Sequence, residues 1–135
     1  MKSSKYSSLK FLIFIFLFAG CCQSKINIVG DDKDIHGCIG SAGYQWSDIR
    51  KECIRSFELP LQLLNPNKTN FTSVLFSADN KQAEVFSKEG HFILELENSL
   101  LYKYSKKGTV FMLSNSNGKW EFSDAEKHFI YYQAK

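Results

Sequence analysis

The sequence predicts a mainly β fold, all-β or α+β with little helix, arranged as an antiparallel meander or a small barrel. Two observations lead to this prediction. Short segments of alternating apolar and polar residues recur at intervals of about ten residues between turn-forming residues, which is typical of antiparallel sheets. In addition, no stretch outside the first twenty residues keeps a helical apolar period long enough to form a substantial helix.

Residues 1–20 are predicted to be an export signal and not part of this fold. Lys2, Lys5 and Lys10 form a basic leader, and the unbroken apolar run Phe11–Phe18 follows it. This run is too short to cross a bilayer, which takes about 20 apolar residues, but its length suits the apolar region of a signal peptide.

The end of the leader, Phe18-Ala19-Gly20-Cys21, resembles the lipobox of bacterial lipoproteins, although that family usually carries Leu where Phe18 stands. The resemblance implies that Cys21 becomes the N-terminus and carries lipid through a thioether. The chain would then be anchored to an inner or outer bacterial membrane, with its domain in the periplasm or at the cell surface. The alternatives are cleavage at Cys22, or a secreted protein cut near Gly20.

The leader also carries the excess positive charge of the chain. The sequence has 17 basic and 14 acidic residues, and three of the basic residues precede Gly20. The processed chain is therefore formally neutral and has no long-range field to attract a polyanion. We predict a membrane contact through the lipid and no nucleic-acid partner.

Residues 21–35 are predicted to be the lipidated N-terminus and a tether, and residues 36–135 a single β-rich domain. Cys38 and Cys53 flank a glycine-rich segment and are the natural pair for a disulfide in an oxidising compartment. We therefore expect a disulfide-closed loop at the start of the domain. Within this loop, Ser47 is expected to cap a short helical turn.

The period of two begins at Phe57. Residues 57–63 alternate, but Pro60 lacks an N–H group, so this segment is expected to be an edge strand. Asn117-Gly118 is a strong signal for a tight hairpin turn. The remaining predicted strands are residues 72–77, 82–86, 92–96, 101–104, 109–113, 119–122 and 128–132.

No pattern in the chain predicts an enzyme. Cys38 lies near His36, but a thiolate nucleophile also needs a group that orients its base and an oxyanion hole, and the sequence specifies neither. The three histidines have no zinc-binding spacing with one another or with the cysteines. We accordingly predict no metal and no cofactor.

An acidic stretch imitates the first half of a calcium-binding loop. Asp32, Asp34 and Gly37 occupy matching positions, but Gly43 stands where a bidentate Glu is required. A solvated charge cluster is the expected structure, and a weak cation site that includes Asp31 is the alternative.

A candidate binding site lies inside the disulfide loop. Tyr44 and Trp46 occupy alternate positions, and residues of these types dominate binding interfaces. Arg50 and Arg55 would supply polar contacts beside them. The competing interpretation is that Trp46 packs on the disulfide and caps the core.

Two resemblances extend these predictions. Residues 36–55, with the pattern His-Gly-Cys-x-Gly-Ser-Ala-Gly-Tyr-x-Trp-Ser and then Cys-Ile-Arg, resemble a motif of small uncharacterised bacterial lipoproteins. Residues 74–96 are similar to the strand pattern of membrane-bound inhibitors of c-type lysozyme, which are eight-stranded barrels. The inhibitory Ser-Gly-x-x-Tyr loop of those proteins has no match, and residues 116–120 are the nearest stretch. We therefore expect a non-enzymatic binding lipoprotein, with lysozyme inhibition as the alternative function.

Overall fold

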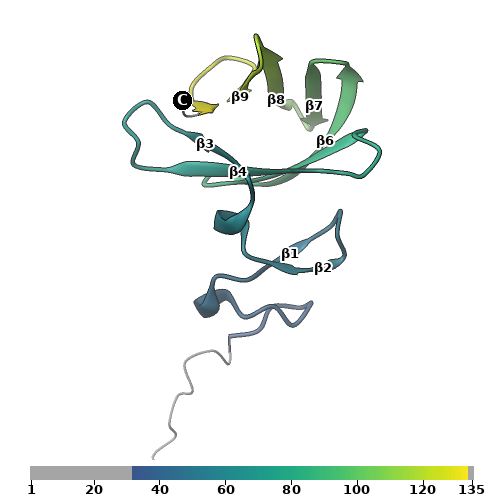
Figure 1. The fold of residues 1–135 in the computed structure, drawn as a ribbon, viewed down its shortest axis with the longest axis vertical. Helices are drawn as coiled ribbons and strands as arrows, with labels where there is room; N and C mark the ends of the chain where they lie inside the picture. Colours follow the sequence, from purple (N-terminus) through teal and green to yellow (C-terminus); the bar gives the residue numbers. More distant parts are fainter. Residues whose placement is uncertain (1–31, 134–135) are drawn as a thin grey trace, which may run out of the picture.

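A computed structural model of the chain describes residues 32–133 (Figure 1). The predicted signal peptide, the predicted lipidation site Cys21, Cys22 and most of the predicted tether lie outside the described residues. The described part contains ten strands, two short 3₁₀ helices and no α-helix. The prediction of a mainly β fold is confirmed.

Eight of the strands close into an antiparallel barrel. Each strand pairs with the next one along the chain, and β10 pairs with β3 to complete the circle. The sequence left a meander and a barrel open, and the structure is an up-and-down meander closed into a barrel. The strands are β3 (Leu61–Leu64), β4 (Phe71–Phe76), β5 (Gln82–Ser87), β6 (Gly90–Asn98), β7 (Leu101–Lys106), β8 (Thr109–Ser116), β9 (Lys119–Asp124) and β10 (Ile130–Gln133).

Tight turns fix the register of this barrel. Asn117 and Gly118 both have positive φ, 53° and 78°, as a two-residue turn of the type favoured in hairpins requires, and they join β8 to β9. The hairpin predicted at this dipeptide is confirmed. Lys107 and Gly108 form the same kind of turn between β7 and β8.

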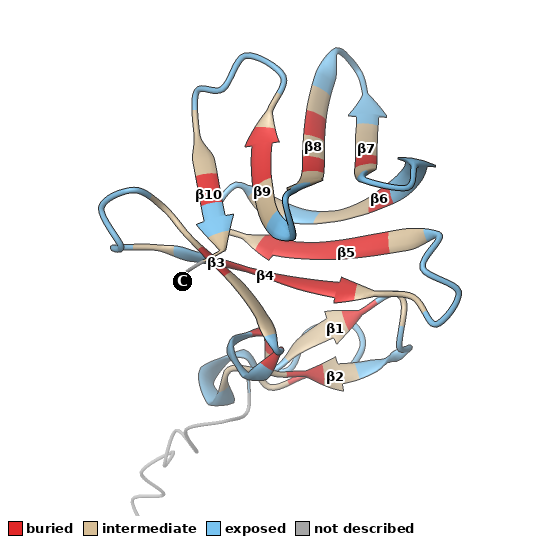
Figure 2. Cartoon of the chain, turned by 45° about the horizontal axis from the view of Figure 1, so that its top comes forward, coloured by how far each residue is buried: buried red, intermediate tan, exposed pale blue. Residues whose placement is uncertain are grey.

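Side chains fill the barrel. Alternate residues of every strand point inward, and the most buried of them include Leu63, Leu94, Leu113 and Phe122. Aromatic rings meet at the centre, where Phe122 lies 5.9 Å from Phe111 between ring centroids. An eight-stranded barrel has an interior about wide enough for its own side chains. Figure 2 shows that the buried residues of the barrel lie in the strands, whereas the turns between them are exposed.

The predicted edge strand at residues 57–63 is wrong in two respects. Ser56–Glu58 form the second 3₁₀ helix (η2), and β3 begins only after Pro60. The strand is also not an edge, because it pairs with β4 on one side and β10 on the other. Proline thus precedes the ladder, where its missing N–H costs no hydrogen bond.

A small two-stranded sheet precedes the barrel. β1 (Gln45–Ser47) pairs with β2 (Glu52–Ile54), and Cys53 is disulfide-bonded to Cys38, so the predicted disulfide is confirmed. We call residues 45–54 the disulfide hairpin. The helical turn expected after Ser47 is present as a single turn, in which the N–H of Lys51 donates to the Ser47 carbonyl at 2.8 Å and Ser47 Oγ accepts the N–H of Arg50 at 3.0 Å. A hairpin this short has no room for a longer helix between its strands.

Residues 32–41 fold against one another through aspartate side chains. The Asp32 carboxylate accepts hydrogen bonds from the N–H and hydroxyl of Ser41, and Asp34 Oδ1 accepts the N–H groups of His36 and Cys38. These bonds to Ser41 lower the pKa of Asp32. Because local hydrogen-bond donors occupy these oxygens, Asp32 and Asp34 stabilise the fold of this segment. Gly40–Ala42 form the first 3₁₀ helix (η1).

Candidate functional site

The disulfide hairpin lies against the outside of the barrel. Ile54 and Leu59 pack on Leu75 of β4 and Phe86 of β5, and these four side chains form a second buried cluster separate from the barrel interior. In Figures 1 and 2 the hairpin lies beside β4. The outer face of β4 and β5 is therefore a buried seam between hairpin and barrel.

A charged residue lies at the middle of this seam. Glu84 alternates along β5 with Ala83 and Val85, which point into the barrel, so its side chain points outward; the hairpin nevertheless covers it completely, to 0% exposure. Its carboxylate accepts the hydroxyl of Ser47 at 2.5 Å and the backbone N–H of Asp48 at 2.6 Å. A third donor is the N–H of Ile49, at 3.3 Å. Glu84 thus holds the turn of the hairpin onto the barrel.

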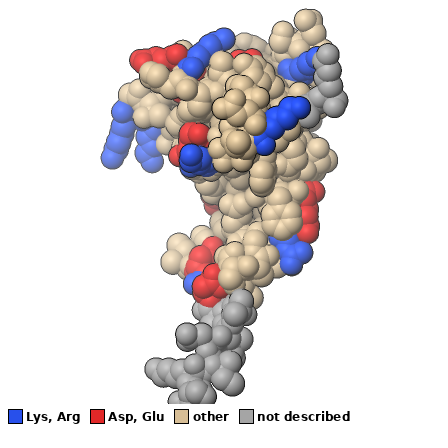
Figure 3. Space-filling view, turned by 90° about the vertical axis from the view of Figure 1, so that its left-hand side faces the viewer, with Lys and Arg blue, Asp and Glu red and all other residues tan. Residues whose placement is uncertain are grey.

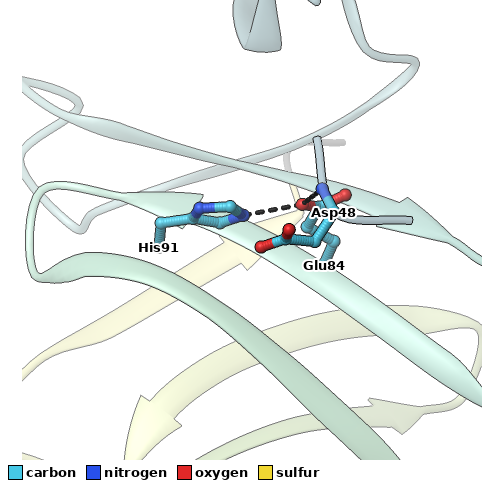
Figure 4. A group of neighbouring side chains, drawn as sticks. All are labelled: Asp48, Glu84 and His91. Carbon is cyan, nitrogen blue, oxygen red and sulfur yellow. Dashed lines mark hydrogen bonds and ion pairs between the residues drawn. The ribbon is translucent and has the colours of Figure 1, made fainter. Parts of the chain in front are cut away.

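The fourth partner of Glu84 is a histidine on the next strand. His91 of β6 is paired with Phe86 in the sheet and stacks on its ring, with centroids 4.6 Å apart. The stacking directs His91 Nε2 to Glu84 Oε1 at 2.7 Å (Figure 4). About a third of the His91 side chain is exposed. In this pair, the Glu84 carboxylate is buried while part of the His91 ring is exposed to solvent.

The pKa of Glu84 is lowered in this environment. Burial alone raises the pKa of a carboxyl group, because a low dielectric disfavours its charge. Hydrogen bonds from His91, Ser47 and the two backbone N–H groups stabilise the charged form and outweigh that effect. Glu84 is consequently an ionised carboxylate at neutral pH, although no solvent reaches it.

Asp48 completes a group of three potential ligands. It lies on the turn of the hairpin, and its carboxylate accepts the indole N–H of Trp46 at 3.2 Å. One ligand atom each from Asp48, Glu84 and His91 lies within 4.8 Å of the other two, as Figure 4 shows for the three side chains. The hairpin turn and two neighbouring barrel strands thus bring two carboxylates and an imidazole together.

A groove of about 520 Å³ opens beside this group. Its walls include Gln45 and Ser56 from the hairpin side and Phe71, Lys88 and His91 from the barrel. His91 therefore contacts both the seam and the groove, whereas Glu84 does not line the groove.

The structure brings three of the four predicted binding residues together. Tyr44, Arg50 and Arg55 line a separate cleft of about 270 Å³ on the hairpin. The Arg55 guanidinium lies over the Tyr44 ring, 4.6 Å from its centroid, and pairs with Glu58 at 3.1 Å. We call this the Tyr44 cleft.

Trp46 does not line the Tyr44 cleft. Its ring stacks on His36 with centroids 4.3 Å apart, and the residue is half-buried and outside both core clusters. It therefore neither caps the core nor joins the other three residues, because the stacking partner holds its ring on another part of the hairpin.

Sequence analysis missed Glu84 and His91. In an alternating strand, a glutamate is expected to face solvent, and the donors that make it a buried carboxylate come from residues 47–49. One signal was available: Phe86 shares the outward face with Glu84, and an aromatic residue there indicates that something covers that face.

No protein-family model matches the sequence, and comparison with curated proteins and with solved structures gives no match. Among residues 32–133, no helix is long and apolar enough to cross a membrane.

Proposed function

We propose that this chain is a lipid-anchored protein of the bacterial cell envelope whose barrel domain binds another protein and has no catalytic role. The anchor is the predicted thioether on Cys21. The Cys38–Cys53 disulfide supports this location, because such bonds persist in oxidising compartments outside the cytosol.

The observation that carries the binding role is the Tyr44 cleft. An aromatic ring with an arginine stacked on it is a common anchor of protein interfaces, and such anchors bind best when held rigid before the partner arrives. Here the disulfide fixes one strand of the hairpin and Glu84 fixes its turn. The cleft is therefore preorganised on a rigid base.

The charge distribution favours a protein over a polyanion. Most of the face drawn in Figure 3 is uncharged, and the lysine, arginine, aspartate and glutamate side chains are scattered over it. Such an interspersed surface has no extended basic patch on that face to follow a phosphate backbone.

A photo-crosslinking amino acid at Arg50, in the lipidated chain in living cells, tests the binding role. We expect a crosslinked species of defined mass that disappears when Tyr44→Ala and Arg55→Ala are added. The same probe at Lys107, on an exposed turn of the barrel, is the control position. Absence of a product at Arg50, or a product that persists in the double variant, would refute the proposed site.

Tyr132→Ala with Lys127→Ala is the matched control pair. Tyr132 is 42% exposed, close to the 36% of Tyr44, and both control residues lie on the barrel. We expect this pair to leave crosslinking from Arg50 unchanged.

Mass spectrometry of the N-terminal peptide tests the anchor separately. We expect a lipid thioether on Cys21 in protein recovered from membranes. An unmodified N-terminal segment on protein from the cytosol would refute the envelope location without bearing on the Tyr44 cleft.

Lysozyme inhibition is a second candidate, and the fold favours it. The closed eight-stranded antiparallel barrel is the architecture that the resemblance to membrane-bound lysozyme inhibitors implies. Residues 116–120, nearest to the family's inhibitory loop, form a tight two-residue turn at the β8–β9 junction. If hen-egg-type lysozyme keeps its lytic activity in the presence of excess purified protein, this function is excluded.

A further inference from the structure

We propose that the seam between hairpin and barrel binds a divalent transition-metal ion through Asp48, Glu84 and His91. This site was not expected from the sequence, because these residues are separated by 36 and 7 positions and form no linear motif. The fold brings them together, because the hairpin turn lies over β5 and β5 pairs with β6.

The charge balance of the seam is the first argument. The Glu84 carboxyl group is fully buried, and its hydrogen-bond partners are a hydroxyl, two backbone N–H groups and an imidazole. Among the described residues, no lysine or arginine lies within ion-pair distance of it. Buried charges are normally paired with an opposite charge or coordinate a metal. A divalent ion would supply the missing positive charge.

The geometry is the second argument. Glu84 Oε1 and His91 Nε2 are 2.7 Å apart in a hydrogen bond, and a small side-chain movement to about 3.3 Å would place both atoms on one tetrahedral ion. The backbone N–H of Asp48 is fixed on the Glu84 carboxylate, so its side chain starts from the rim of the same site. Its own carboxylate is about half exposed and can turn toward the ion.

The donor set selects the class of ion. One imidazole and two carboxylates suit Zn²⁺, Ni²⁺ or Cu²⁺, whereas Ca²⁺ and Mg²⁺ take oxygen ligands. In the absence of metal, His91 Nε2 is hydrogen-bonded to the Glu84 carboxylate. When the ion binds, Nε2 becomes its ligand and gives up its proton to water, and the imidazole carries a single proton on Nδ1. Water would complete the coordination from the groove that His91 lines.

A bound ion would connect three elements at once. Asp48 belongs to the disulfide hairpin, Glu84 to β5 and His91 to β6. Binding would therefore stabilise the docked hairpin, and with it the rigid base of the Tyr44 cleft. The metal site itself does not depend on that cleft having a partner.

Titration calorimetry with Zn²⁺ tests the proposal. The full chain carries Cys21→Ser and Cys22→Ser and is kept in detergent. Because the other two cysteines form the disulfide, no free thiol then competes for Zn²⁺. We expect one ion per chain. His91→Gln, which can still donate to Glu84, should weaken binding by about tenfold or more. A dissociation constant weaker than about 1 mM for the parent chain would overturn the proposal.

The matched control is His128→Gln. His128 also contacts two carboxylates, but Asp124 lies on its Nδ1 at 2.7 Å and Glu126 on its Nε2 at 3.3 Å, so the two acids face opposite nitrogens. One ion cannot use this arrangement as a three-ligand site. We expect unchanged affinity, and an equal loss in this variant would overturn the assignment.

Asp48→Asn covers the case in which His91→Gln fails to fold. The hydrogen bond from residue 48 to Glu84 comes from the backbone N–H and is retained in this variant, while the negative charge of the Asp48 carboxylate is lost. In a Trp120→Phe background, Cu²⁺ should quench Trp46, whose indole contacts Asp48, and Asp48→Asn should require several-fold more ion for the same quenching. Equal quenching curves, with near-ultraviolet circular dichroism showing an intact fold, would overturn the proposal.

Discussion

Replacing Glu84 with alanine should release the disulfide hairpin from the barrel. The substitution leaves the donors of Ser47, Asp48 and Ile49 facing an apolar seam without an acceptor. Each buried donor that loses its partner costs about 1–3 kcal/mol, and such costs are not additive. Removal of one partner from a buried charged network costs about 3–5 kcal/mol. We therefore expect the free energy that docks the hairpin to fall by about 3–5 kcal/mol.

Hydrogen exchange and urea unfolding together measure this effect. The amides of Asp48 and Ile49 should lose most of their protection in Glu84→Ala, while amides in β8 and β9 keep theirs, because the barrel interior is not altered. Ser47→Ala is the graded control and should cost about 2 kcal/mol, since it removes one hydrogen bond to the carboxylate and the bond that Ser47 Oγ accepts from the N–H of Arg50. A loss below about 1 kcal/mol in Glu84→Ala, with unchanged exchange at both amides, would refute the argument that this carboxylate holds the hairpin.

Three further predictions concern other parts of the molecule. Replacing Cys38 and Cys53 with serine should cost about 3 kcal/mol in urea unfolding, because the disulfide closes a loop of 15 residues, and an unchanged midpoint would contradict this. Burial, with a hydrogen bond to Glu89, raises the pKa of Tyr131 from 10 to about 12. Between pH 10 and 12 the folded chain therefore keeps the Tyr131 hydroxyl proton that the unfolded chain has lost. The stability that this difference contributes is complete below pH 10 and should disappear as the pH rises toward 12. Absorbance titration should find one tyrosine near 12 that is missing in Tyr131→Phe; the same late titration in that variant would disprove the assignment. Phe122→Ala should cost about 3–5 kcal/mol in urea, since the ring is fully buried among other rings, and a loss under ~1 kcal/mol would show that the core collapses around the gap.

Local residues predicted much of the barrel. Most predicted strands agree with the observed ones, some of them with ends a few residues longer or shorter, because alternating side chains and turn residues act over a few positions. Asn117-Gly118 is the clearest example, since positive φ at two successive residues is readily adopted by few residue types. Pro60 was less informative, because it predicted an edge strand. The proline precedes β3, and β3 has a paired strand on each side in the closed barrel.

The candidate sites show the limit of local information. Tyr44, Arg50 and Arg55 were predicted as neighbours and do share a cleft, because β1, β2 and their turn lie close together in the sequence. Trp46 was predicted with them, but its ring stacks on His36, which lies ten residues earlier in the sequence and outside the hairpin.

The sequence alone determined the antiparallel pattern, the tight turns and the Cys38–Cys53 pair, since alternation, backbone preference and short loop closure are properties of neighbouring residues. Only the tertiary structure decided that β10 meets β3, and that Glu84 is buried under a hairpin more than thirty residues earlier. The physical reason is desolvation. Whether an outward-facing carboxylate is an ordinary surface charge or the centre of a site depends on which distant surface excludes water from it.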